Sequence, residues 1–156
     1  MIRNDKYNII SLILFFLIIF SFSKSKANEV IVFLSLKNNE VNLRQGPSFE
    51  YPIKFIYKKK YLPIKVIDKK DEFRRIIDIK NNSGWIHKTQ LKKNKSFILL
   101  EDQLLYLKPT KYSKPILKIS KGRLLLAKKC KKKWCEVKTE EYEGWISTGN
   151  LWGIIK

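Results

Sequence analysis

Hydrophobic and polar residues alternate along much of the chain, and this pattern predicts β-strands. A period of two places apolar side chains on one face of a strand and polar side chains on the other. A β-branched and aromatic run at residues 30–36 is expected to form a buried strand. The alternating apolar positions are Leu62, Ile64 and Val66 in the first half of the chain, and Cys135 and Val137 in the second.

Turn-forming residues separate these stretches. They lie at Gln45–Ser48, Asp68–Glu72, Asn81–Gly84 and Lys121–Gly122. No long segment after Phe22 shows the 3.6-residue period of an amphipathic helix. Short strands at regular spacing without helices favour small barrels or sandwiches, so we predict an all-β fold.

The two halves of the chain repeat the same landmarks in the same order. The separations are 63 residues from Pro52 to Pro115, 61 from Phe73 to Trp134, and 60 from both Gly84 to Gly144 and Leu91 to Leu151. A repeat of about 60 residues is near the lower size limit for an independent core. We therefore expect two tandem domains, residues 28–95 and 96–156, that pack on each other.

The N-terminal segment has the features of a secretory signal peptide. An apolar run from Ile9 to Phe22 is shorter than the roughly 20 residues that span a bilayer. Small residues at Ser25 and Ala27 fit a signal-peptidase site, with cleavage before Asn28. We expect residues 1–27 to be removed and the protein to be exported to the periplasm. The alternative is an uncleaved signal that anchors it to the inner membrane.

The chain is strongly basic, with 33 Lys and Arg against 14 Asp and Glu and a net charge of +19. One interpretation is attraction to an anionic lipid surface or polymer. The other is compositional, because the lysines are spread over several expected loops. Nucleic acid is not an expected partner, since the signal segment directs the protein away from it.

Two cysteines and one histidine are the candidates for chemistry beyond binding. An even cysteine count in an exported chain favours a disulfide between Cys130 and Cys135, across the ends of a hairpin; two free thiols are the alternative. His87 has no clustered ligands for a metal. A Cys135–His87 pair would fit no peptidase spacing, and a disulfide would consume its thiol. We expect no enzyme activity, no cofactor, no metal and no small-molecule substrate.

The first half contains the string VNLRQGPS at residues 41–48, followed by Tyr51-Pro52, Phe73 and Gly84-Trp85-Ile86. This combination resembles a bacterial SH3-like domain, a family that usually has Trp at the position of Phe73. The second half is a degenerate copy that replaces this string with residues 105–110. Its two cysteines and the closing Leu151-Trp152-Gly153 resemble the exported two-repeat SH3-like proteins of Gram-negative bacteria. The resemblance covers residues 35–153 and implies two tandem small SH3-like β-barrels.

Such domains are similar to binding modules found beside cell-wall hydrolases, or alone as envelope proteins. The resemblance therefore implies a non-catalytic envelope protein that binds peptidoglycan stem peptide or a segment of an envelope protein. The alternative is a structural docking protein whose basic surface binds anionic lipid or polymer. Oligomeric state is left open. The expected ligand groove is lined by the aromatic residues Tyr51, Phe73, Tyr112 and Trp134.

Several of these residues have both a binding and a structural interpretation. We expect Trp134 to be partly exposed, because Cys135 and Val137 occupy the core face of the same strand and Trp134 lies on the opposite face. Arg44 either binds a carboxylate or clamps its own loop. For Trp85 and Trp145 we favour a structural role as barrel plugs, after glycines that permit a bend. Arg74 matches Cys135 in the repeat, and the pattern does not explain it.

Overall fold

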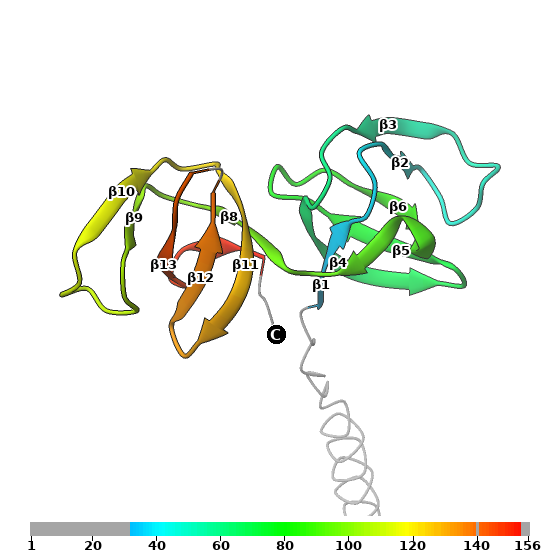
Figure 1. The fold of residues 1–156 in the computed structure, drawn as a ribbon. Helices are drawn as coiled ribbons and strands as arrows, with labels where there is room; N and C mark the ends of the chain where they lie inside the picture. The colour runs from blue at the N-terminus through cyan, green and yellow to red at the C-terminus, as the bar shows by residue number, and fades with distance from the viewer. Residues whose placement is uncertain (1–31, 140, 154–156) are drawn as a thin grey trace, which may run out of the picture. The chain divides into compact units, whose positions relative to one another are not determined.

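The computed structural model describes residues 32–139 and 141–153, which form two seven-stranded antiparallel sheets (Figure 1). The all-β fold with two tandem domains is confirmed. The first sheet has the strand order β3-β2-β6-β5-β4-β1-β7, and the second has the order β10-β9-β13-β12-β11-β8-β14. Adding seven to each strand number of the first order gives the second order. The two halves that repeat in sequence therefore also share one sheet topology.

The strands of the first sheet are β1 (Val32–Leu36), β2 (Val41–Arg44), β3 (Ile53–Tyr57), β4 (Pro63–Lys70), β5 (Phe73–Ile77), β6 (Ser83–His87) and β7 (Leu91–Lys93), with the short 3₁₀ helix η1 (Lys88–Gln90) before β7. The strands of the second are β8 (Ser96–Leu99), β9 (Gln103–Tyr106), β10 (Pro115–Ile119), β11 (Leu124–Lys131), β12 (Trp134–Lys138), β13 (Glu143–Ser147) and β14 (Leu151–Trp152). The change from one sheet to the other falls between Lys93 and Ser96.

Each sheet encloses its own hydrophobic core. The predicted alternation is confirmed, because Ile64, Cys135 and Val137 are buried and belong to these cores. The expected strand at residues 30–36 is present as β1 from Val32 onward, but only its last two residues are buried and Val32 is 43% exposed. The first core consists of Leu36, Val41, Leu43, Tyr57, Ile64, Ile76, Ile86 and Leu91, and the second of Phe97, Leu99, Leu105, Ile119, Leu125, Cys135, Val137 and Ile146.

A buried hydrogen bond helps to close the first barrel. The Tyr57 hydroxyl donates to the carboxylate of Asp78 at 3.0 Å, and Asp78 in turn accepts from the backbone N–H groups of Lys80 and Asn82. Burial raises the pKa of Tyr57, and the negative charge of Asp78 raises it further, so the hydroxyl keeps its proton and remains a donor. Asp78 thereby joins β3 to the turn between β5 and β6.

Tyr57→Phe should lower the free energy of unfolding by roughly 1–3 kcal/mol, because the buried Asp78 carboxylate loses a donor while the ring stays in place. Urea unfolding of the two proteins measures the difference. An unchanged midpoint would show that the remaining donors to Asp78 suffice.

The disulfide predicted between Cys130 and Cys135 is confirmed. The two cysteines are directly opposed residues of β11 and β12, at the end of a hairpin. The equivalent opposed pair in the first barrel is Lys69 and Arg74, so no bridge can form there. Arg74 instead donates from Nη1 to the carbonyl oxygens of Asp71 and Phe73, which explains an arginine at a core-facing position near the hairpin turn.

Reduction of this disulfide should lower the stability of the second barrel by roughly 2 kcal/mol, the chain-entropy value for so short a loop. The chain has only two cysteines, so a reducing agent acts on this bond alone. Hydrogen exchange, followed residue by residue, should show faster exchange in β11–β13 and no change in β4–β6. Equal acceleration in both barrels would contradict the prediction.

The two Gly-Trp pairs have a different role from the one predicted. Ile86 and Ile146 belong to the two core clusters, while Trp85 and Trp145 follow glycine onto the opposite face of the strand, where Trp85 is half-buried and Trp145 is buried. The two glycines allow the neighbouring strands to approach each other closely. An ideal Cβ at Gly84 would lie 2.7 Å from the Arg44 carbonyl oxygen, and one at Gly144 would lie 2.7 Å from that of Tyr106.

Hydrogen bonds and a ring contact connect residues of the two sheets. The Trp152 indole N–H donates to the Pro63 carbonyl oxygen at 2.9 Å, and its ring meets Phe33 edge-on with centroids 5.2 Å apart. Ser96 lies within hydrogen-bonding distance of Ser35, at 3.0 Å between the hydroxyl oxygens. Polar and aromatic side chains near β1, β8 and β14 therefore join the domains.

The predicted signal peptide, residues 1–27, lies outside the described residues. Among residues 32–139 and 141–153, no helix is long and apolar enough to cross a membrane.

Candidate ligand-binding faces

The outer face of β2, β6 and β5 carries a tryptophan between two arginines. Trp85 on β6 is directly opposite Arg44 on β2 and directly opposite Arg75 on β5. Directly opposed residues share a face of the sheet. This is the outer face, because Gly84 and Ile86 on either side of Trp85 are buried against the core. The row Arg44–Trp85–Arg75 therefore lies across three neighbouring strands.

An aromatic cluster lies beside this row. Phe49, in the β2–β3 loop, is 63% exposed, and its ring centroid lies 5.2 Å from that of Phe73 and 4.9 Å from that of His87. Phe73 was expected to offer its ring to a ligand, but this is wrong: it is only 5% exposed, because Phe49 and His87 cover it. The exposed ring of the cluster is that of Phe49, a loop residue that no sequence motif marked as a site residue.

Arg44 holds the loop that carries these aromatic residues. Its Nη1 donates to the carbonyl oxygens of Phe49 at 2.9 Å and Tyr51 at 2.8 Å, and its guanidinium carbon lies 5.5 Å from the centre of the Phe49 ring. The loop clamp is thus present. Tyr51, 47% exposed, packs on Gly46, where a Cβ would lie 2.5 Å from the tyrosine ring. Gly46 is required at this position for that reason.

The arginines of this face have no acidic partners among the residues that the structure describes. Every ion pair found there uses a lysine, as in Lys88–Glu72 at 2.6 Å, which lowers the pKa of Glu72. A guanidinium that is not paired with a carboxylate can bind one from a ligand through two parallel hydrogen bonds. The face therefore combines aromatic surface with the guanidinium of Arg75 and with the N–H groups of Arg44 other than those of Nη1, which hold the loop.

The second barrel has the same face with different chemistry. Tyr106 takes the place of Arg44, opposite Trp145, and Glu136 takes the place of Arg75. Glu136 is paired with Lys129 at 3.0 Å, and that lysine also lies over the Trp145 ring. Trp134 is half-buried, as expected, with its ring edge-on to Tyr106 at a centroid distance of 5.6 Å. Trp145 is buried on this face, and the charge of Glu136 is already matched by Lys129.

The predicted site residues do not meet in one cluster. Arg44, Tyr51 and Phe73 belong to the first sheet and its loop, whereas Trp134 belongs to the second. Tyr112 lies in the β9–β10 loop with its side chain 99% exposed. Among the described residues, no ring contact joins Tyr51 or Phe73 to Tyr112 or Trp134.

Cys135 and His87 do not form a catalytic pair. The Cys135 sulfur is bonded to Cys130, so there is no thiol. The His87 ring packs on Phe49 and Phe73, and its Nδ1 lies 2.8 Å from the Thr89 hydroxyl oxygen. His87 thus supports the aromatic cluster.

Comparison with known proteins identifies one family. The profile of the bacterial SH3 domain family matches the chain twice, at residues 37–93 and 101–153. No curated protein sequence matches it. Three solved structures that it resembles, each with a TM-score of 0.36, are NlpC2 of Trichomonas vaginalis (15% identity, covering 80% of this chain and 49% of that one), NlpC1 of the same organism (15%, 83% and 48%) and an NlpC/P60 family protein of Bacillus cereus (13%, 77% and 55%). The chain thus spans about half the length of these structures.

Proposed function

Because the chain belongs to the bacterial SH3 domain family, we propose that it is a non-catalytic binding module of the cell envelope whose first barrel holds a peptide that bears a carboxylate. The candidate peptides are the stem peptide of peptidoglycan and a segment of an envelope protein. The proposed location is the periplasm, to which the expected signal peptide would direct the chain.

One observation carries this proposal: Arg44 and Arg75 flank Trp85 on an open sheet face, with no carboxylate of the described residues paired to either. Phe49 and Tyr51 extend the surface with exposed rings. Aromatic rings supply rigid contact area for a peptide, and the guanidinium groups supply charge-assisted hydrogen bonds to its carboxylates. In the second barrel, Trp134 and Tyr106 provide further aromatic surface, but no guanidinium groups.

A pull-down of residues 28–156 on purified peptidoglycan, at low and at high salt, tests the proposal. Binding that depends on aromatic contact and bidentate hydrogen bonds should largely persist at high salt, because salt screens exposed charges most strongly. Absence of retention on peptidoglycan, together with no envelope protein captured by crosslinking, would overturn it.

The alternative function is docking on an anionic surface through the lysines. The observation that favours it is the run Lys131–Lys133, which is exposed at the β11–β12 hairpin. Binding of this kind should disappear as ionic strength rises. Loss of retention at high salt, with Arg75→Gln having no effect at low salt, would support docking instead.

A further inference from the structure

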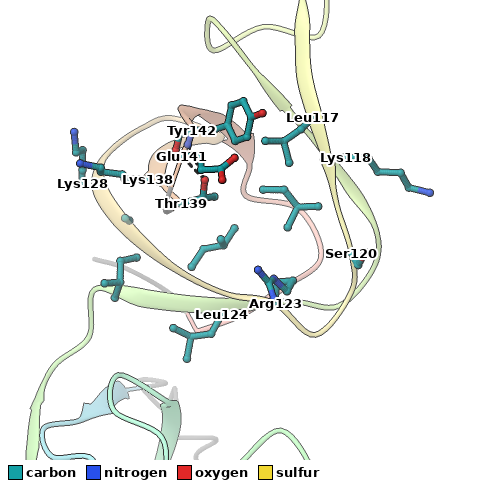
Figure 2. Close-up of a pocket in the computed structure, with 14 residues that line it drawn as sticks. Leu117, Lys118, Ser120, Arg123, Leu124, Lys128, Lys138, Thr139, Glu141 and Tyr142 are labelled. Atoms are coloured by element: carbon teal, nitrogen blue, oxygen red, sulfur yellow. Dashed lines mark hydrogen bonds between the residues drawn. The ribbon is translucent and has the colours of Figure 1, made fainter.

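The second barrel contains a cavity of about 870 Å³ between β10, β11 and the β12–β13 turn (Figure 2). This volume lies within the range of cavities that bind small molecules. None of the residues on the two aromatic faces lines it, so it is separate from the proposed peptide site. Its apolar lining consists of Leu117, Ile119, Leu124, Leu125, Leu126, Ala127 and the ring of Tyr142.

Comparison of the two barrels explains why this space is present. Leu117 is opposite Leu105 and Ile119 is opposite Gln103; the corresponding pairs in the first barrel are Phe55 with Leu43 and Tyr57 with Val41. Large aromatic side chains thus occupy in the first barrel the positions that hold Leu117 and Ile119 in the second.

The turn residue that faces these positions differs as well. Tyr57 and Phe55 pack edge-on, with ring centroids 4.8 Å apart, and Tyr57 bonds to Asp78 of the β5–β6 turn. The residue equivalent to Asp78 is Thr139, whose hydroxyl is used within its own turn, with Tyr142. Among the residues that the structure describes, the second barrel therefore has smaller side chains here and no counterpart of the Tyr57–Asp78 hydrogen bond.

Charges around the cavity favour an anion. Four basic residues and one acid, Glu141, are among its lining residues. Lys118 is paired with Asp102 and Lys128 with Glu143, whereas Arg123 forms no ion pair with any residue that the structure describes. In Figure 2, Arg123 lies at one margin of the cavity, and Glu141 and Tyr142 lie at the opposite margin. An anionic group is therefore best placed beside Arg123.

We propose that this cavity binds the acyl chain of an anionic amphiphile, with the head group at Arg123 and the hydrocarbon chain against Leu117, Leu124 and Leu126, the aliphatic lining residues that are accessible. A saturated chain suits the aliphatic side chains of this lining, because neither side of that contact has hydrogen-bonding groups; the polar lining residues are left to the head group and to solvent. Transfer of each methylene from water to such a lining strengthens binding roughly fourfold at most. The source of the chain is either a free fatty acid or a phospholipid, and the two require different probes.

Calorimetric titration of residues 28–156 with monomeric dodecanoate tests the proposal. Binding should weaken several-fold from dodecanoate to decanoate, and dodecyltrimethylammonium, with the same chain and the opposite charge, should bind at least tenfold more weakly than dodecanoate. Equal binding of the two head groups would overturn the role of Arg123.

A variant that copies the first barrel, Leu117→Phe with Ile119→Tyr and Thr139→Asp, should fill the cavity and weaken dodecanoate binding at least tenfold. Because this variant could misfold, far-UV circular dichroism accompanies it, and Arg123→Gln, at an exposed position, serves as a second variant that should weaken binding several-fold. The matched control Lys58→Gln removes the same charge from an exposed side chain of the first barrel and should change nothing. Unchanged binding in Arg123→Gln overturns the proposal, even if the triple variant fails to fold.

Vesicles of phosphatidylglycerol distinguish the two sources. If a phospholipid chain enters the cavity, the triple variant that fills the cavity should bind vesicles more weakly than the parent, just as it should bind dodecanoate more weakly. If only a free fatty acid enters, vesicle binding should be equal in both proteins while dodecanoate binding still differs. No dodecanoate binding at all, with vesicle binding lost equally in Lys58→Gln and Arg123→Gln, would show a surface-charge interaction only and overturn the proposal.

Discussion

Replacing Gly84 with valine should unfold the first barrel while the second stays folded. A Cβ at this position would lie 2.7 Å from the Arg44 carbonyl oxygen and 2.7 Å from Cγ of Leu43. The carbonyl belongs to the neighbouring strand β2, so it cannot move aside as a flexible side chain would. Overpacking a core costs about 1–3 kcal/mol, and a clash with backbone belongs at or above the upper end of that range. A barrel of this size has little stability in reserve.

Two-dimensional NMR of the full two-barrel protein measures this effect separately for each barrel. The signals of β2, β5 and β6 should collapse to unfolded positions, whereas those of β9, β12 and β13 should remain dispersed. Gly149→Ala is the matched control, because the nearest atom to a Cβ there is the Ser147 hydroxyl oxygen at 3.7 Å. A Gly84→Val protein that melts like the parent would show that β2 and β6 are farther apart than the structure has them.

The double substitution of Arg44 and Arg75 by glutamine should weaken binding of a stem peptide at least tenfold. Each charge-assisted hydrogen bond contributes about 1.5–3 kcal/mol, and a loss of 1.4 kcal/mol corresponds to a factor of ten. Glutamine keeps part of the side chain's length and polarity but cannot make the bidentate ion pair. Calorimetric titration with the peptide measures the difference.

Two controls separate the lost ion pair from other effects. Lys58→Gln with Lys59→Gln removes the same charge from two exposed residues and should leave affinity unchanged. Arg44 also holds the Phe49 loop, so Arg75→Gln alone, which breaks no loop contact found in the structure, should weaken binding several-fold by itself. If Arg75→Gln binds as tightly as the parent, the guanidinium groups do not recognise the carboxylate.

Much of the fold could be predicted from the sequence, because alternation and repetition are local signals. The offsets of 60–63 residues between landmarks correspond to equivalent strands of two sheets with one topology. The cysteine pair was predictable for the same reason, since a short hairpin brings Cys130 opposite Cys135. Arg74 needed the structure, because its two carbonyl partners are set by the geometry of the turn.

The binding face was only partly predictable. Arg44 and Tyr51 were found because they lie within or beside the VNLRQGPS string. The expected exposure of Phe73 failed because Phe49, a loop residue 24 positions away, covers it. Trp85 and Arg75 were missed as a pair, since strand register rather than sequence spacing brings Arg44, Trp85 and Arg75 into one row. The period-two pattern around Gly84 and Ile86 did carry a signal that Trp85 faces outward.

The most direct test of the proposed peptide site is an NMR titration of residues 28–156 with a stem peptide and with the same peptide whose carboxylates are converted to amides. The proposal predicts shifts centred on Arg44, Phe49, Arg75 and Trp85, with at least tenfold weaker binding of the amidated peptide. Shifts confined to the lysine runs, or equal binding of the two peptides, would contradict carboxylate recognition by the first barrel.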